Sequence, residues 1–64
     1  MPTITVTRPA GYVLHVGDGY DFEREGQHFD GVVRGVMPAD AQHVDITLEM
    51  STDEYRRVLA AVNR

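Results

Sequence analysis

Polar and apolar residues alternate along three segments of the chain, which is the pattern of a strand with one buried face. In the first segment, Thr3–Thr7, the pattern predicts that Ile4 and Val6 face the core. In the clearest segment, His43–Met50, every second residue from Val44 onward is apolar. Tyr20–Arg24 alternates in the same way, with its two aromatic residues on one face.

Two further strands are expected from less regular patterns. Tyr12–Val16 is predicted as the second strand, and His28–Met37 as a longer one in which Gly31 and Gly35 indicate a bulge or a bend. Glycine, proline and Asp-Gly steps predict the turns between strands, with hairpins at Asp18-Gly19 and Glu25-Gly26. The predicted turn segments are Arg8–Gly11, Gly17–Gly19, Glu25–Gly26 and Pro38–Ala41.

The C-terminal segment has the signals of a helix. Ser51 and Glu54 fit a capping box, in which each side chain accepts a hydrogen bond from the other residue's backbone N–H. Met50 and Tyr55 occupy the hydrophobic-staple positions on either side. The expected apolar stripe, at helical spacing, consists of Tyr55, Val58, Leu59 and Val62.

The expected fold class is therefore α+β: an antiparallel four- or five-stranded meander sheet with one C-terminal helix packed on one face. Short connections and repeated hairpin turns favour a meander over a crossover topology. Residues 1–64 are expected to form a single small domain, because the chain has no linker, repeat or low-complexity tract.

Composition limits what this domain contains. A chain of 64 residues builds one small core, and the absence of cysteine excludes disulfides and thiolate metal sites. No apolar run approaches the ~20 residues that a membrane span needs, and the N-terminal sequence has no signal-peptide pattern. We therefore expect a cytoplasmic protein.

Charge is distributed unevenly along the chain. All ten Asp and Glu residues lie between Asp18 and Glu54, where the only basic residues are Arg24 and Arg34, which gives a local charge of −8. The other four arginines lie outside this stretch and bring the formal net charge to −4. Crowded like charges oppose a compact fold, so the acids are either scattered over solvated surface or gathered on a face that meets something basic.

A catalytic site has little support in the sequence. His43 and Asp45 are neighbours on one strand face and form the best candidate acid–base pair. Ser51 is expected to cap the helix, which leaves it no role as a nucleophile. We expect a non-enzymatic protein.

Metal binding and cofactors are not predicted either. The oxygen ligands of Asp18, Asp21 and Glu23 lie near a glycine-rich turn, but their spacing does not match an EF-hand loop. The histidines would converge on Zn²⁺ only if the sheet order brought them together. They are His15, His28 and His43.

Direct nucleic-acid binding is disfavoured by the negative net charge and the dispersed arginines. The segment Arg8–Leu14, with the sequence RPAGYVL, resembles the wing hairpin of winged-helix domains in response regulators and antibiotic-pathway activators. No three-helix unit precedes it to supply a recognition helix, so the resemblance assigns no DNA-binding role.

An acidic sheet face is the remaining candidate for function. Residues i and i+2 of a strand lie about 6.6 Å apart on one side, so rows of carboxylates resemble the phosphate line of DNA. The acids expected on strands or their ends are the candidate partner-binding residues. They are Asp21, Glu23, Glu25, Asp30, Asp45 and Glu49.

The leading hypothesis is a small non-catalytic inhibitor or regulator that occupies the basic surface of a nucleic-acid-binding protein. In composition the chain resembles phage-encoded inhibitors, including anti-CRISPR proteins and DNA mimics, which are small, acidic and single-domain. The alternatives are a homo-oligomerising structural module, such as a homodimer, and a small enzyme or metal site around His43 and Asp45. The aromatic residues are either binding anchors or core: Tyr12, Tyr20, Phe22 and Phe29.

Overall fold

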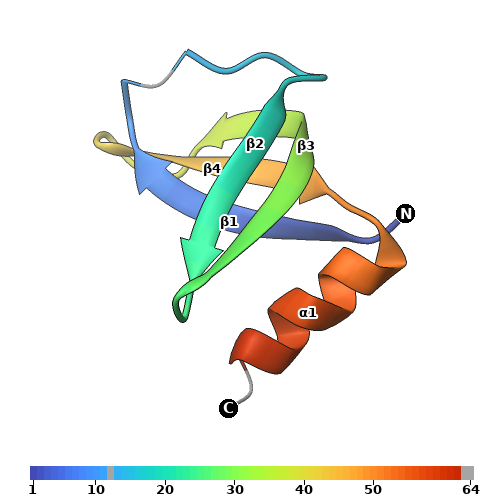
Figure 1. The fold of residues 1–64 in the computed structure, drawn as a ribbon. Coiled ribbons are helices and arrows are strands. Elements are labelled where there is room, and N and C mark those ends of the chain that lie inside the picture. The colour runs from blue at the N-terminus through green and yellow to red at the C-terminus, as the bar shows by residue number, and fades with distance from the viewer. Residues whose placement is uncertain (12, 63–64) are drawn as a thin grey trace.

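The computed structural model describes residues 1–11 and 13–62. It has four antiparallel strands in a curled sheet and one C-terminal helix, an α+β fold as predicted (Figure 1). The elements are β1 (Thr3–Pro9), β2 (Gly19–Arg24), β3 (Gln27–Pro38), β4 (His43–Glu49) and α1 (Thr52–Val62).

The strand order is β1-β4-β3-β2, so β2, β3 and β4 form a meander and β1 pairs with the outer edge of β4. The connection from β1 to β2 therefore runs from one edge of the sheet to the other. This arrangement corrects the prediction of a strand at Tyr12–Val16: Tyr12 lies outside the described residues, and residues 13–16 form no strand.

The segment before β2 is instead a loop held by local hydrogen bonds. The Asp18 N–H donates to the His15 carbonyl, and the Asp18 carboxylate accepts from the His15 N–H. Asp18 precedes β2 and Gly19 is its first residue, so Asp18-Gly19 is not the hairpin turn that we predicted. Leu14 packs against the core, so the loop still contributes apolar contact.

Strand β3 is bent and divides the sheet into two parts. Its first half, from Gln27 to Val32, pairs with β2, and its second half pairs with β4. The register shifts between Val33 and Gly35, which confirms the predicted bulge. The β2–β3 hairpin consequently crosses over β1 and β4 (Figure 1).

Gly31 lies where the hairpin crosses β4. A Cβ at this position would be 3.1 Å from the Leu48 Cβ and 3.3 Å from the Glu49 carbonyl oxygen. The absence of a side chain thus lets the two parts of the sheet approach closely. This close approach encloses the core between them.

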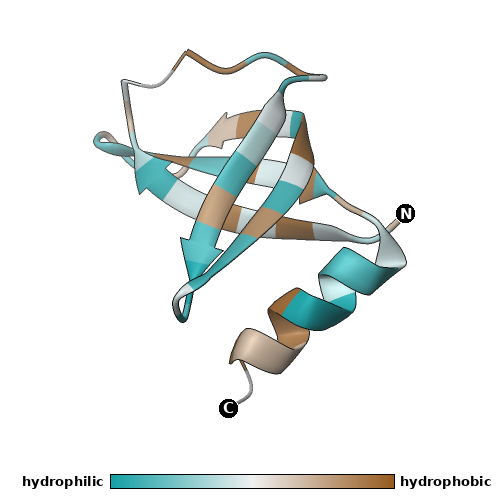
Figure 2. Ribbon diagram, in the orientation of Figure 1, coloured by the Kyte–Doolittle hydropathy of each residue, from teal (hydrophilic) through white to brown (hydrophobic). Residues whose placement is uncertain are grey.

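The core consists of apolar residues from both parts of the sheet and from α1. Phe22 and Phe29 face each other across the hairpin with ring centroids 5.5 Å apart. Apolar bands alternate with polar ones along the strands, as the sequence pattern requires (Figure 2). The buried residues are Val6, Phe22, Phe29, Val33, Ile46, Leu48, Met50, Val58 and Ala61, with Ile4, Leu14, Tyr20, Val44 and Tyr55 packed against them.

Helix α1 begins as predicted but buries a narrower stripe. The Ser51 hydroxyl accepts the Glu54 N–H at 3.1 Å, which is one half of the capping box. The prediction that Leu59 and Val62 belong to the buried stripe is wrong: they are 40% and 49% exposed. The helix contacts mainly β2 and β3, and its buried residues are Val58 and the small Ala61, with Tyr55 packed against the core beside them.

Candidate functional site

Three carboxylates lie together on the outer surface of the β2–β3 hairpin: Asp21, Glu23 and Asp30, here called the hairpin acids. All three are exposed. Asp21 is directly opposite Asp30 in the strand pairing, and Glu23 is two residues further along β2. Like charges placed directly opposite each other on neighbouring strands destabilise a sheet, so this arrangement opposes folding.

The hairpin acids have no arginine partner among the described residues. In the part of the chain that the structure describes, the one neighbour within 4 Å that can carry positive charge is His28, which is opposite Glu23 in the pairing. Its Nδ1 is 3.4 Å from the Asp21 Oδ2, and its Nε2 is 3.8 Å from the Glu23 Oε2. An exposed imidazole neutralises the group only when it is protonated.

A fourth acid, Glu25, stands at the tip of the same hairpin. Glu25 and Gly26 form the two-residue turn and both have positive φ, 54° and 76°. This confirms the predicted hairpin, and positive φ at both positions is the signature of a type I′ turn. Glutamate rarely adopts this backbone conformation, whereas asparagine and glycine do.

The other two predicted acids, Asp45 and Glu49, lie on the outer surface of β4 and are here called the β4 acids. Both have partners: the Thr7 hydroxyl donates to Asp45 at 2.6 Å, and Arg34 donates to both oxygens of Glu49 at 3.3 and 3.4 Å. The structure therefore divides the six predicted residues into an unneutralised group on the hairpin and a partnered group on β4.

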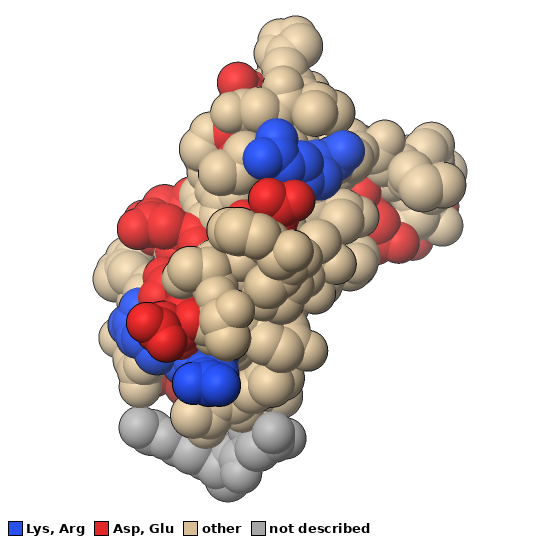
Figure 3. All heavy atoms as spheres, turned by 90° about the vertical axis from the view of Figure 1, so that its right-hand side faces the viewer, with Lys and Arg blue, Asp and Glu red and all other residues tan. Residues whose placement is uncertain are grey.

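Sequence reasoning assigned Glu54 only to the helix cap and missed its main contacts. Its carboxylate accepts the Asp30 N–H at 2.9 Å and pairs with Arg57, instead of accepting the Ser51 N–H that a complete capping box requires. The Asp30 N–H is the main cause that lowers the pKa of Glu54, and Arg57 adds to it. Arginine and carboxylate atoms lie side by side on this side of the molecule (Figure 3).

Arg57 also joins the helix to the hairpin. Its guanidinium lies 4.9 Å from the centre of the Phe29 ring and donates to the His28 carbonyl at 3.4 Å. No local sequence pattern signals these contacts, because Arg57 and His28 are 29 residues apart.

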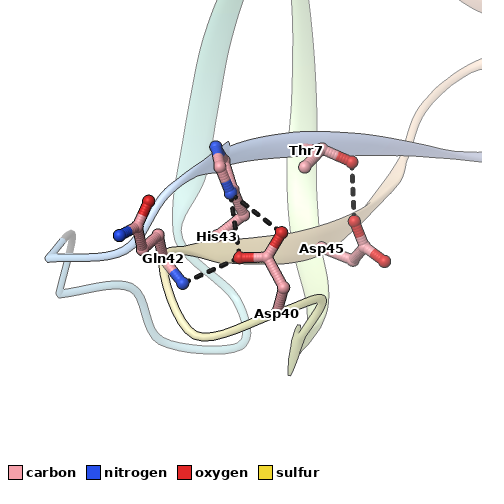
Figure 4. Close-up of polar contacts among 5 residues, drawn as sticks. All are labelled: Thr7, Asp40, Gln42, His43 and Asp45. Atoms are coloured by element: carbon pink, nitrogen blue, oxygen red, sulfur yellow. Dashed lines mark hydrogen bonds and ion pairs between the residues drawn. The ribbon is translucent and has the colours of Figure 1, made fainter.

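The proposed pair of His43 and Asp45 is not formed. The His43 Nδ1 lies 2.9 Å from an oxygen of Asp40, while Asp45 turns toward Thr7 (Figure 4). Asp40 also accepts the Gln42 N–H at 2.7 Å, and this bond, followed by the contact with His43, lowers the pKa of the Asp40 carboxyl. The arrangement closes the turn between β3 and β4.

Within residues 1–11 and 13–62 no group of three or more His, Asp or Glu side chains is placed to hold a metal ion. The part of the surface that the structure describes also has no pocket. The described helix is too short and too polar to cross a membrane.

Comparison with known proteins adds nothing to the geometry: no family model, no curated protein and no solved structure matches this chain.

Proposed function

We propose that this protein is a small, non-catalytic binding module whose hairpin acids occupy a basic, nucleic-acid-binding surface of a partner protein. The observation that carries the proposal is that Asp21 and Asp30 face each other and that no arginine among residues 1–11 and 13–62 neutralises them. Surface residues that reduce the stability of the fold are typical of binding sites, where function is retained at a cost in stability.

The spacing of these charges suits a surface that binds nucleic acid. Directly opposite residues on neighbouring strands lie about 4.5–5.5 Å apart, and Asp21 and Glu23 about 6.6 Å apart along β2. Both distances are within a factor of two of the charge spacing of DNA, in which each strand carries one phosphate per ~3.4 Å of helix axis. A cytoplasmic inhibitor that mimics DNA, as in the phage proteins that the composition resembles, would work in this way.

Charge complementarity accelerates association and sets orientation, while apolar contacts supply most of the affinity. The loop that precedes the hairpin has two exposed apolar residues, Val13 and Val16, which are 82% and 65% exposed. We include this loop in the proposed binding surface because it leads directly into β2.

The experiment is capture from a lysate of the source cells, followed by elution with increasing salt. We expect a nucleic-acid-binding protein that is released steeply between about 0.05 and 0.5 M salt, because the contacts are between exposed charges. DNA should compete with this protein for the captured partner. A partner that stays bound at high salt, or binds DNA and this protein together, would refute the proposal.

A second candidate function, self-association, is favoured by the free edge of β1. Its three outward threonines are uncharged, and paired threonines are favourable neighbours across strands. They are Thr3, Thr5 and Thr7. A homodimer should show a melting temperature that rises with protein concentration.

A further inference from the structure

The two edges of the β2–β3 hairpin differ in whether their backbone groups have partners. On the β3 edge, the Asp30 N–H donates to Glu54 and the His28 carbonyl accepts from Arg57. Side chains of α1 thus satisfy the backbone of β3 on the side away from β2. In an antiparallel pair, groups that point away in this way belong to pairs without mutual backbone hydrogen bonds.

The same geometry fixes the direction of the backbone on β2. Asp21 and Glu23 are the pairing partners of Asp30 and His28, so their own N–H and C=O groups point away from β3. Strand β2 ends the sheet, and no described residue forms a hydrogen bond with these groups. Two donors and two acceptors therefore lie in a row along an exposed edge.

The free edge of β1 has a less complete row of unpaired backbone groups. The Ala10 N–H and the Met50 N–H mark the hydrogen-bonded pairs with β4, so the intervening threonines point outward. At its end, however, Arg8 donates to the Thr7 carbonyl and Pro9 has no N–H. Covered carbonyls and proline are ways in which natural sheets limit strand addition, and β2 has neither.

We infer that the β2 edge binds an extended, basic segment of the partner as an additional antiparallel strand, an inference that rests on the proposed function. The backbone of such a strand would lie about 4.8 Å from the β2 backbone, so side chains on its outer side would lie next to the carboxylates of Asp21 and Glu23. Lysine or arginine at every second position fits them. The alternate side chains would lie beside Tyr20, which is half-buried, and fit if they are apolar.

Charge selects this occupant over a second copy of the chain. Pairing of two β2 edges would place Asp21 and Glu23 of one copy against the same residues of the other, which is unfavourable. A strand with alternate basic residues turns the same repulsion into attraction. Such a strand also supplies hydrogen-bond partners for the backbone groups of the β2 edge.

The test uses an eight-residue peptide of alternating arginine and valine, with capped ends, and the intact 64-residue protein. In the antiparallel arrangement the arginine N–H groups face β2 and the valine N–H groups face away. We expect N-methylation of the arginines to weaken binding at least tenfold, and N-methylation of the valines to change it less than threefold. Backbone amides of Asp21 and Glu23 should become protected from hydrogen exchange on binding.

Protein variants give an independent comparison. Asp21→Pro removes a charge and an outward N–H, while Asp21→Asn removes only the charge, so the proline variant should bind at least fivefold more weakly. Thr5→Pro removes an outward N–H on the β1 edge and should leave binding within twofold. Melting curves establish that each variant is folded, and the methylated peptides test the idea without any variant.

The outcomes separate strand addition from the proposed function. If both methylated peptides bind the wild-type protein equally well, or if only valine methylation weakens binding, antiparallel strand addition is overturned. The acidic-surface proposal would survive that result as long as Asp21→Asn and Glu23→Gln still reduce the affinity for the unmethylated peptide. If those two substitutions leave affinity unchanged, the proposed function fails instead.

Discussion

The hairpin acids and the β4 acids belong to one small sheet, yet they differ in what surrounds them. Glu49 pairs with Arg34 and Asp45 accepts a hydrogen bond from Thr7, whereas Asp21 faces Asp30 and, of the described residues, has only a histidine as a charge partner. We therefore expect the β4 acids to contribute to the fold and the hairpin acids to oppose it. A carboxylate's formal charge is therefore a poor guide to its function until its neighbours are known.

The largest effect on stability is expected at Gly31. This residue lies where the hairpin, which carries one group of acids, crosses β4, which carries the other. Gly31→Ala should destabilise the protein by about 1–3 kcal/mol, because the added Cβ lies too close to Leu48 and to the Glu49 backbone. Gly35→Ala is the matched control in the same strand. Its Cβ meets nothing closer than 3.9 Å, so chemical denaturation should show a change within about 0.5 kcal/mol. Equal effects at both glycines would contradict the close crossing.

Next in size is the loss of the Glu54 carboxylate, an acid that stabilises the hairpin instead of opposing it. Glu54→Gln should cost about 1–2 kcal/mol, since it weakens charge-assisted bonds to Asp30 and Arg57. Asp53→Asn, at the neighbouring position, is the control and should cost a few tenths of a kcal/mol. Urea unfolding at neutral pH measures both.

The same carboxylate gives stability a defined pH dependence. Folding lowers the pKa of Glu54 below its ordinary value of 4.5, so the unfolded chain binds more protons in this range. Its contribution is complete above pH 4.5 and is lost as the pH falls through the folded-state value. In Glu54→Gln the decline in stability below pH 4.5 should be shallower than in the wild type. Parallel curves would show that Glu54 is not a source of the decline.

The sequence predicted the elements better than their arrangement. Alternation located β1, β2 and β4, and Ser51 located the start of α1, because these signals depend on neighbouring residues. The pairing of β1 with β4 brings together residues about forty positions apart, for which local patterns carry no signal. The same limit applies to Arg34 and Glu49: their pairing depends on the bulge in β3, so the sequence could not separate the partnered acids from the unpartnered ones.

A smaller effect on stability, opposite in sign, is expected when the repulsion between the facing acids is removed. Asp21→Asn or Asp30→Asn should stabilise the fold by about 0.2–1 kcal/mol, whereas Glu49→Gln should destabilise it by a similar amount. Both changes should shrink in ~1 M salt, where the screening length is about 3 Å. Thermal melts at low and high salt provide the comparison, and destabilisation by Asp21→Asn would mean that the facing acids do not oppose folding.

The smallest effect concerns the hairpin tip. Glu25→Asn should stabilise the protein by about 0.5 kcal/mol, because asparagine adopts the positive φ of this turn more readily than glutamate. Glu25→Gln removes the same charge without this backbone preference and is the control. A gain that is the same in both variants would assign the effect to charge alone.

The most direct test of the contrast between the two groups is the affinity of matched double variants for the partner captured from lysate. Asp21→Asn with Asp30→Asn, and Asp45→Asn with Glu49→Gln, each change the formal net charge from −4 to −2. By isothermal titration calorimetry at low salt, we expect the hairpin variant to lose at least tenfold in affinity and the β4 variant less than threefold. Equal losses, or a larger loss for the β4 variant, would contradict the assignment of binding to the hairpin acids.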